Sequence, residues 1–352
     1  MEQLSNPEAV LLKCIGRSIG YWGTQSGETD CQGIKTVFKD RDERIFGSLT
    51  KTNGQNSQWR WAVPGGRNHG YSEGTNMTKR LALLENGVAV AYEVIGSPSQ
   101  PVVMPILGIT DNITDWPERF CMPLVEAGYC VVRHESRDMG WSTQMDGATY
   151  SMEHIVADTL ALMDQLKIEA AHFIGYSFGG AIAQLLALTE PARARALVLL
   201  QSTNYNPALP ARSPAVLAAM NGACVPYATA SEAVAAIKAV RLACNGSRHA
   251  MSDAEAQISA ERSVARGYCP HGTARMIEAR KRTAPFFERL TAIACPTLVL
   301  QGSDDPIFPR GHGEDIASRI RGAKLEYMQG AGHNHPESLI PQMIESMLGF
   351  LR

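Results

Sequence analysis

Residues 170–180 read Ala170-Ala171-His172-Phe173-Ile174-Gly175-Tyr176-Ser177-Phe178-Gly179-Gly180. The residues up to Gly175 do not alternate with charges, which is typical of a strand covered on both faces. Residues 181–188 are rich in helix formers, and Pro191 ends that helix. The pattern Gly175-x-Ser177-x-Gly179 between them predicts a nucleophile elbow, a tight strand–turn–helix that holds a serine in a strained conformation.

The two glycines of this pattern have a physical reason. A Cβ atom at either position would make the strand and the helix clash in so tight a turn. The new helix would then point its free N–H groups at an oxyanion formed beside Ser177. Taken alone, the pattern fits an ordinary strand-to-helix turn equally well, but the strand before it and the helix after it favour the elbow.

Strands and helices alternate on both sides of the elbow. Residues 80–84 and 88–95 predict two strands joined by a hairpin turn at Asn86-Gly87. Further strands are expected at 101–107, 130–133, 196–200, 297–300 and 324–328, and helices at 116–126, 150–166, 311–320 and 337–351. This order predicts an α/β fold, a mostly parallel sheet with antiparallel first strands and helices on both faces.

The alternation stops between residues 203 and 290. This stretch is rich in alanine and helical in pattern, so we expect a helical cap inserted between two parts of the core, 77–202 and 291–352. The alternative is that it merely extends the core, but it carries no strand signal. Its basic residues stand at helical intervals, which predicts a solvated face rather than an anion clamp. They include Lys238, Arg241 and Arg248.

Residues 1–76 differ from the rest of the chain. They are rich in Gly, Asn, Ser and Gln, and no helical or strand period persists in them. Such a composition predicts a poorly ordered N-terminal extension. Met77 resembles a natural translation start, and we hypothesise that the extension before it is dispensable. The alternative is a small element that covers the mouth of the active site.

Two carboxylates follow the strand expected at 297–300, where an acid is needed. Asp305 stands directly before Pro306, which holds it in an extended or turn geometry. We therefore interpret Asp305 as the acid and Asp304 as a turn residue that caps its own loop. The alternative is that both are ordinary turn aspartates.

A base is expected after the last strand, in the loop that contains two histidines. His333 follows Gly332, where the backbone can approach the elbow closely. His335 is the rival base, and we expect it to face solvent or to cap the following helix. The chain order Ser177, Asp305, His333 is the order of a Ser-His-Asp triad in the α/β-hydrolase arrangement.

The tetrahedral oxyanion of acyl transfer needs two N–H donors. One is expected to be the backbone N–H of Phe178, at the start of the helix. The other is expected from the loop after the strand at 101–107, most simply the N–H of Ile109 beside Gly108. Such donors contribute roughly 3–4 kcal/mol each to the transition state.

The overall composition and charge exclude several classes of protein. The 352 residues are 45% hydrophobic, and their formal net charge of −2 predicts neither a nucleic-acid nor a membrane partner. No stretch is long and apolar enough to span a bilayer. The eight cysteines show no metal-ligand spacing, so we expect reduced thiols, no metal and a cytoplasmic protein. The start, Met1-Glu2-Gln3, lacks the features of a secretory signal.

Residues from about 80 to 352 resemble the α/β-hydrolase superfamily, and in particular its aclacinomycin methylesterase-like branch. The stretches that carry the resemblance are Asp115-Trp116-Pro117-Glu118-Arg119-Phe120, Gly128-Tyr129-Cys130-Val131-Val132-Arg133, Arg137-Asp138-Met139-Gly140-Trp141-Ser142-Thr143, and Pro296-Thr297-Leu298-Val299-Leu300-Gln301-Gly302. The resemblance implies carboxylic ester hydrolysis without a cofactor. This sequence departs from the family pattern at two places that bear on the base of the substrate pocket. Leu107-Gly108 stands where many relatives have His-Gly. The acidic residue that usually precedes the Arg-Asp pair is displaced, and the sequence there is His134-Glu135-Ser136.

These features predict a serine carboxylesterase that acts on uncharged esters of short to medium chain length. A serine at the elbow argues against haloalkane dehalogenases and epoxide hydrolases, whose relatives have aspartate there. Lactonase, aminopeptidase and C–C hydrolase activities remain open on the same fold. A catalytically silent binding protein with this fold is disfavoured by the complete triad.

Overall fold

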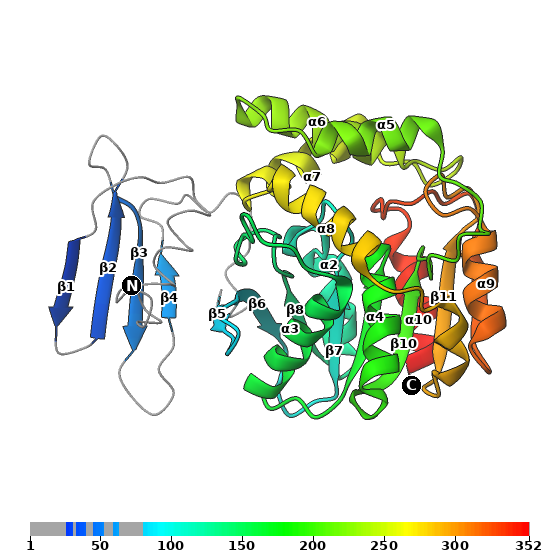
Figure 1. Cartoon of the computed structure of the whole chain (residues 1–352), viewed down its shortest axis with the longest axis horizontal. Coiled ribbons are helices and arrows are strands. Elements are labelled where there is room, and N and C mark those ends of the chain that lie inside the picture. The colour runs from blue at the N-terminus through cyan, green and yellow to red at the C-terminus, as the bar shows by residue number, and fades with distance from the viewer. Residues whose placement is uncertain (1–25, 31–32, 40–44, 53–58, 63–79, 352) are drawn as a thin grey trace.

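The computed structural model describes residues 26–30, 33–39, 45–52, 59–62 and 80–351. Its larger sheet has eight strands in the order β12-β11-β10-β9-β7-β8-β6-β5 (Figure 1). These strands are β5 (Arg80–Leu83), β6 (Ala89–Ile95), β7 (Val102–Ile106), β8 (Cys130–His134), β9 (Ala171–Tyr176), β10 (Ala194–Leu200), β11 (Thr297–Gly302) and β12 (Lys324–Met328). Strands β5 and β6 pair in antiparallel fashion and the other six run parallel, which confirms the predicted fold class.

Strand β9 occupies the middle of the sheet. It pairs with β7 on one side and β10 on the other, and five of its six residues are buried, which explains why it carries no alternating charges. Gly175 stands opposite Ile106 of β7 and Leu199 of β10. The chain therefore leaves these three strands at one level, and the segments that follow them meet at the carboxyl edge of the sheet.

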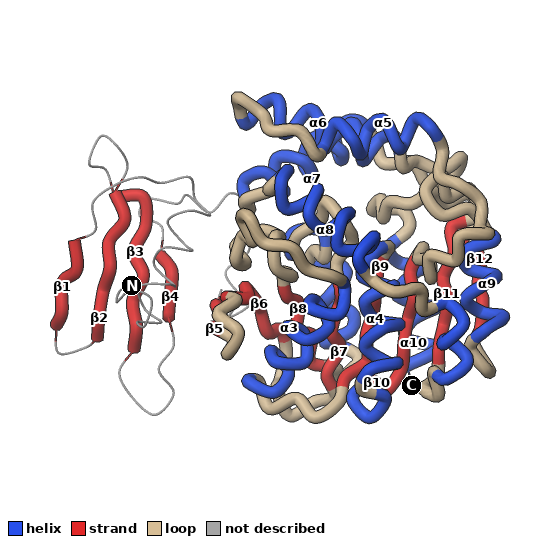
Figure 2. The backbone as a smooth tube through the Cα atoms, viewed as in Figure 1, coloured by secondary structure: helices blue, strands red, loops and turns tan. Residues whose placement is uncertain are grey.

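Helices cover both faces of this sheet (Figure 2). Helices α2 (Glu118–Glu126) and α10 (Ile340–Leu351) pack on each other, and α3 (Met152–Gln165) packs on α4 (Phe178–Thr189), with α9 (Gly311–Arg319) beside β11 and β12. Among the helices that the structure describes, none is both long and apolar enough to cross a membrane.

Four further helices lie between β10 and β11 in the chain and above the carboxyl edge of the sheet (Figure 1). They are α5 (Pro214–Ala223), α6 (Ala230–Ala243), α7 (Asp253–Ala265) and α8 (Pro270–Arg282). The side chains of Ser213, Thr229 and Ser252 accept the free N–H groups at the starts of α5, α6 and α7. We refer to these four helices as the cap; its bounds at 203 and 290 stay a prediction.

The described residues before Arg80 form four strands in a separate antiparallel sheet. They are β1 (Ser26–Asp30), β2 (Gly33–Lys39), β3 (Ile45–Thr52) and β4 (Trp59–Ala62), paired in that order. The sequence predicts no regular element here. The pattern was weak because β1, with the sequence Ser-Gly-Glu-Thr-Asp, contains no apolar residue. Met77, the proposed boundary, lies outside the described residues.

Candidate active site

Ser177 lies on the turn between β9 and α4. Its backbone has φ 55° and ψ −120°, a conformation that non-glycine residues adopt rarely and at a cost. The surrounding structure holds it there, because the Ser177 N–H donates to the Leu200 carbonyl at 2.9 Å and the Ser177 carbonyl accepts from Ser202 Oγ at 2.7 Å. The elbow predicted from the sequence is thus present in the backbone.

The glycines around Ser177 are required by backbone packing. A Cβ at Gly175 would lie 2.5 Å from the Gly180 Cα, and a Cβ at Gly179 would lie 2.3 Å from the carbonyl oxygen of Ile106. Real Cβ atoms essentially never approach so closely. The elbow packs against β7 and against the first turn of α4 at these two points.

Ser177, His333 and Asp305 form one continuous hydrogen-bonded chain. Ser177 Oγ lies 2.9 Å from His333 Nε2, and His333 Nδ1 lies 2.8 Å from Asp305 Oδ2. The side chains of His333 and Asp305 are 3% and 0% exposed. The residues that the sequence placed at the ends of three different strands therefore meet within hydrogen-bond distance.

The acid is held by its own loop. Asp305 Oδ1 accepts the backbone N–H groups of Ile307 and Phe308 at 2.8 and 2.9 Å, which leaves Oδ2 to face the imidazole. Asp304 instead turns outward, where its carboxylate accepts from Ser303 Oγ and from the N–H of Ser247. Only Asp305 has a carboxylate oriented toward His333.

The second histidine of the loop has a different environment from the one expected. His335 is only partly exposed and caps no helix: its Nε2 lies 2.8 Å from Gln201 Oε1, and its ring packs at 4.2 Å on that of Tyr176. Burial, with the nearby His333 and Arg241, lowers the pKa of His335 to about 3. The expectation left out Gln201, the residue directly after β10, whose side chain meets His335 from 134 positions earlier in the chain.

The two expected oxyanion donors flank Ser177. Phe178 is the first residue of α4, and Ile109 follows Gly108 on the loop after β7. This loop approaches the nucleophile closely, because a Cβ at Gly108 would stand 3.2 Å from Ser177 Cβ. Within the described chain, no hydrogen bond engages the backbone N–H of either residue. Both N–H groups are thus available to a ligand beside Ser177.

A cavity of about 40 Å³ opens at Ser177 between the sheet edge and the cap. Much of its lining is apolar, from Ile109, Phe178, Met220, Val240, Ile307 and Phe308. A larger cavity of about 150 Å³ shares Asp111, Tyr176 and Arg241 with it.

A buried ion-pair cluster, which the sequence does not predict, borders both cavities. Arg241 of α6 donates from Nη1 to Asp111 Oδ1 at 2.7 Å and from Nη2 to Asp115 Oδ1 at 2.8 Å. The expected solvated face is therefore wrong for Arg241, whose side chain is 9% exposed. Lys238, one turn earlier, pairs with the exposed Asp253, as a solvated face predicts.

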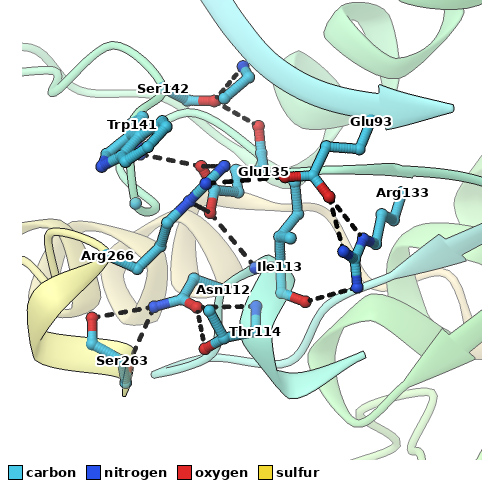
Figure 3. A network of polar contacts seen from close by, with 12 residues as sticks. Glu93, Asn112, Ile113, Thr114, Arg133, Glu135, Trp141, Ser142, Ser263 and Arg266 are labelled. Carbon is cyan, nitrogen blue, oxygen red and sulfur yellow. Dashed lines mark hydrogen bonds and ion pairs between the residues drawn. The ribbon is translucent and has the colours of Figure 1, made fainter. Parts of the chain in front are cut away.

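The cap is joined to the core by further buried polar contacts (Figure 3). Arg266, at the end of α7, donates from Nε to Glu135 Oε1 at 2.8 Å, and its guanidinium stacks 3.8 Å above the Trp141 ring. Asn112 Nδ2 donates to both oxygens of Ser263 at 3.1 Å. Breaking such buried pairs is costly, so α7 is fixed over the loop that carries Ile109.

Comparison with known proteins places this geometry among hydrolases. Residues 101–337 match the family model described as the alpha/beta hydrolase fold. In the part of the chain that the structure describes, no group of His, Cys, Asp and Glu side chains is arranged to hold a metal ion.

Curated relatives share about a quarter of their residues with this chain. Rhodomycin D methylesterase of Streptomyces peucetius is 28% identical over 271 residues, which cover 71% of this chain and 90% of the relative. A putative carbamate hydrolase of Variovorax paradoxus is 28% identical over 264 residues, 74% of this chain and 95% of the relative. The methylesterase agrees with the branch that the sequence resembles.

Solved structures agree with the fold. A hydrolase from Pseudomonas aeruginosa PA01 aligns with a TM-score of 0.63 at 25% identity, over 78% of this chain and 98% of that one. A meta-cleavage product hydrolase from Pseudomonas fluorescens IP01 aligns with a TM-score of 0.64 at 20% identity, over 77% and 97%.

Proposed function

Because the chain belongs to the alpha/beta hydrolase family, we propose that it is a carboxylic ester hydrolase with Ser177, His333 and Asp305 as its catalytic triad. The observation that carries the proposal is the unbroken chain of hydrogen bonds from Ser177 Oγ through His333 to Asp305. The methylesterases among its relatives support an ester as the substrate.

Each group has a defined part in this mechanism. His333 Nε2 accepts the proton of Ser177 as Oγ attacks the ester carbonyl, and it then returns the proton to the leaving alcohol. Asp305 holds the imidazole in the required tautomer and stabilises the imidazolium. The N–H groups of Ile109 and Phe178 bind the oxyanion, and loss of one such donor typically lowers kcat by about 100- to 1,000-fold. Water then hydrolyses the acyl-enzyme.

The cavity supports uncharged esters of short to medium acyl chain as substrates. Its lining is largely apolar and its volume of about 40 Å³ is small. Each buried CH₂ contributes about 0.8 kcal/mol until the cavity is full. Values of kcat/KM across C2 to C16 p-nitrophenyl esters are therefore expected to rise, to peak below about C10 and to fall. A maximum at C12 or longer would refute a closed acyl pocket.

The nucleophile is tested by substitution and by labelling. Ser177→Ala is expected to abolish ester hydrolysis without change in the unfolding midpoint, and a serine-directed phosphonate is expected to label Ser177. Ser231→Ala is the matched control, because Ser231 is an exposed serine of the cap. Labelling at another residue would overturn the assignment.

Other substrates of the same triad are distinguished in the same assay. A relative from Pseudomonas sp. strain CF600, 26% identical, is named 2-hydroxymuconate semialdehyde hydrolase. The ester panel is therefore run beside lactones, aminoacyl amides and a vinylogous 1,5-diketone that reports C–C cleavage. Turnover of none of these by the wild type would favour a catalytically silent binding protein.

A further inference from the structure

Asp111 carries a buried oxygen without a partner. The residue lies on the loop after β7, two positions beyond Ile109, and its side chain is 1% exposed. Its Oδ1 accepts from Arg241, but within the described residues Oδ2 has no hydrogen-bond partner. A buried carboxylate oxygen left without a donor is rare in proteins and costly in free energy.

This oxygen lies close to the nucleophile. A Cβ placed on Gly108 would lie 2.6 Å from Asp111 Oδ2 and 3.2 Å from Ser177 Cβ, so both atoms border the same small space. Asp111 lines the same small cavity as Ser177 and His333. Thr110 before it has φ 76°, which is unusual for a β-branched residue, so the fold holds this part of the loop against local strain.

The surroundings of Asp111 lack a donor rather than an acceptor. The cluster contains two carboxyl groups, Asp111 and Asp115, and one guanidinium, that of Arg241. One guanidinium offsets the charge of only one carboxylate. Burial raises the pKa of Asp115 to about 7, and the neighbouring Asp111 adds to that rise while Arg241 opposes it. A ligand that brings a donor would satisfy the free oxygen.

We propose that Asp111 Oδ2 accepts a hydrogen bond from the substrate and thereby selects esters that carry a donor near the scissile carbonyl. The donor is a hydroxyl group, placed one or two carbons from that carbonyl, so the ester remains uncharged. This inference rests on the proposed ester hydrolysis and adds the substrate class to it.

The physical basis of the selection is the unpaired oxygen itself. A site built to accept a substrate donor rejects an analogue that lacks it, because the buried acceptor is then left unsatisfied. We expect wild-type kcat/KM to favour a donor-bearing ester over its plain analogue by about ten- to a hundredfold.

Three methyl esters of equal chain length test this inference: butyrate, 3-hydroxybutyrate and 3-aminobutyrate, with acid release followed at constant pH. The wild type is expected to prefer the 3-hydroxybutyrate ester over the butyrate ester. A preference for the 3-aminobutyrate ester alone would show that a positive charge is recognised instead, and it would overturn the inference. In Asp111→Asn the amide oxygen can still accept from Arg241, but an NH₂ donor then takes the place of the acceptor Oδ2. We expect that variant to lose the preference, so that its kcat/KM values on the hydroxybutyrate and butyrate esters become equal.

Asp253→Asn is the control, because Asp253 also pairs with a cationic residue of α6 but lies exposed. It is expected to keep the wild-type preference. Equal rates on the three esters by the wild type would overturn the inference whether or not Asp111→Asn folds. A preference that survives in folded Asp111→Asn would overturn the role of Asp111. Hydrolysis of no ester at all would instead overturn the proposed function on which the inference rests.

Discussion

His333 and His335 stand two residues apart but are held in different ways. His333 is fixed from both directions, because its N–H donates to the Cys244 carbonyl of the cap at 2.8 Å and its carbonyl accepts from the Tyr176 hydroxyl. His335 is held by Gln201 on the side of the sheet and lines the larger cavity. Only His333 touches Ser177.

Substitution of the two histidines therefore separates them. His333→Ala is expected to lower kcat for ester hydrolysis by roughly 1,000-fold or more, because Ser177 loses its proton acceptor. His335→Gln keeps a hydrogen-bonding side chain and is expected to lower kcat by less than about tenfold. The measurement is steady-state hydrolysis of one p-nitrophenyl ester by folded variants. Equal losses would contradict the choice of base.

At the scale of residues, the candidate triad was predictable because its order along the chain is itself a signal. Each member follows a strand, and strands of a parallel sheet end at one edge. Arg241 and Asp111 were not predictable in the same way. An arginine at helical spacing has the same sequence pattern whether its face meets water or the core, and only the fold brings α6 over the loop after β7.

The elbow can form only because the residues at its close contacts, such as Gly179, have no Cβ atom. Gly179→Ala would place a Cβ 2.3 Å from the Ile106 carbonyl oxygen, so β7 and α4 must separate. We expect a loss of about 1–3 kcal/mol in the free energy of unfolding and a large loss of activity, because Ser177 moves with α4. Urea unfolding and an ester assay measure the two effects.

Gly349→Ala is the matched control for this substitution. Gly349 lies exposed in α10, and a Cβ there would meet nothing within 4 Å. Alanine is the better helix former, so a gain of about 0.5–1 kcal/mol is expected. If both variants behave alike, the close contact of the elbow with β7 is not what requires glycine at 179.

At the scale of elements, the order of strands and helices from Arg80 onward was predictable, with ends displaced by a few residues. The helix expected at 337–351 begins at Ile340, for example. Strands β1 to β4 were not predicted. β1 contains no apolar residue, and the alternation in β4 spans only four residues, the shortest length at which such a pattern indicates a strand.

The first 76 residues can be tested as part of the whole molecule. If they are a dispensable extension, a chain that starts at Met77 is expected to keep its unfolding midpoint and its kcat/KM on short esters. Circular dichroism and the ester assay measure both. A truncated chain that folds but has altered kcat/KM would favour the alternative, in which the extension covers the active-site mouth.

Stability at low pH depends on His134, a buried histidine outside the proposed triad. His134 is 3% exposed in β8, and burial lowers its pKa to about 4, whereas an unfolded histidine titrates at about 6.5. The unfolded chain therefore binds the extra proton first. The contribution of His134 is complete above pH 6.5 and is lost progressively as the pH falls toward 4.

We expect this single group to remove about 2 kcal/mol from the free energy of unfolding between pH 7.5 and pH 5. His134→Gln cannot titrate, so its loss over the same interval should be smaller by that amount. Urea unfolding of both proteins at the two pH values measures the difference, and other titrating groups cancel in it. Identical losses would show that His134 is protonated in the folded protein.

The separation of the triad along the chain has a consequence for synthesis. Ser177 and His333 are 156 residues apart, and the base lies beyond the strand made last, β12. At about 5–20 residues per second, a ribosome releases the serine roughly 8–30 s before the histidine that is proposed to activate it. During that interval the nascent chain carries an ordinary, unreactive hydroxyl. On the proposed mechanism, hydrolytic activity begins only when the C-terminal strand and loop have left the ribosome and joined the sheet.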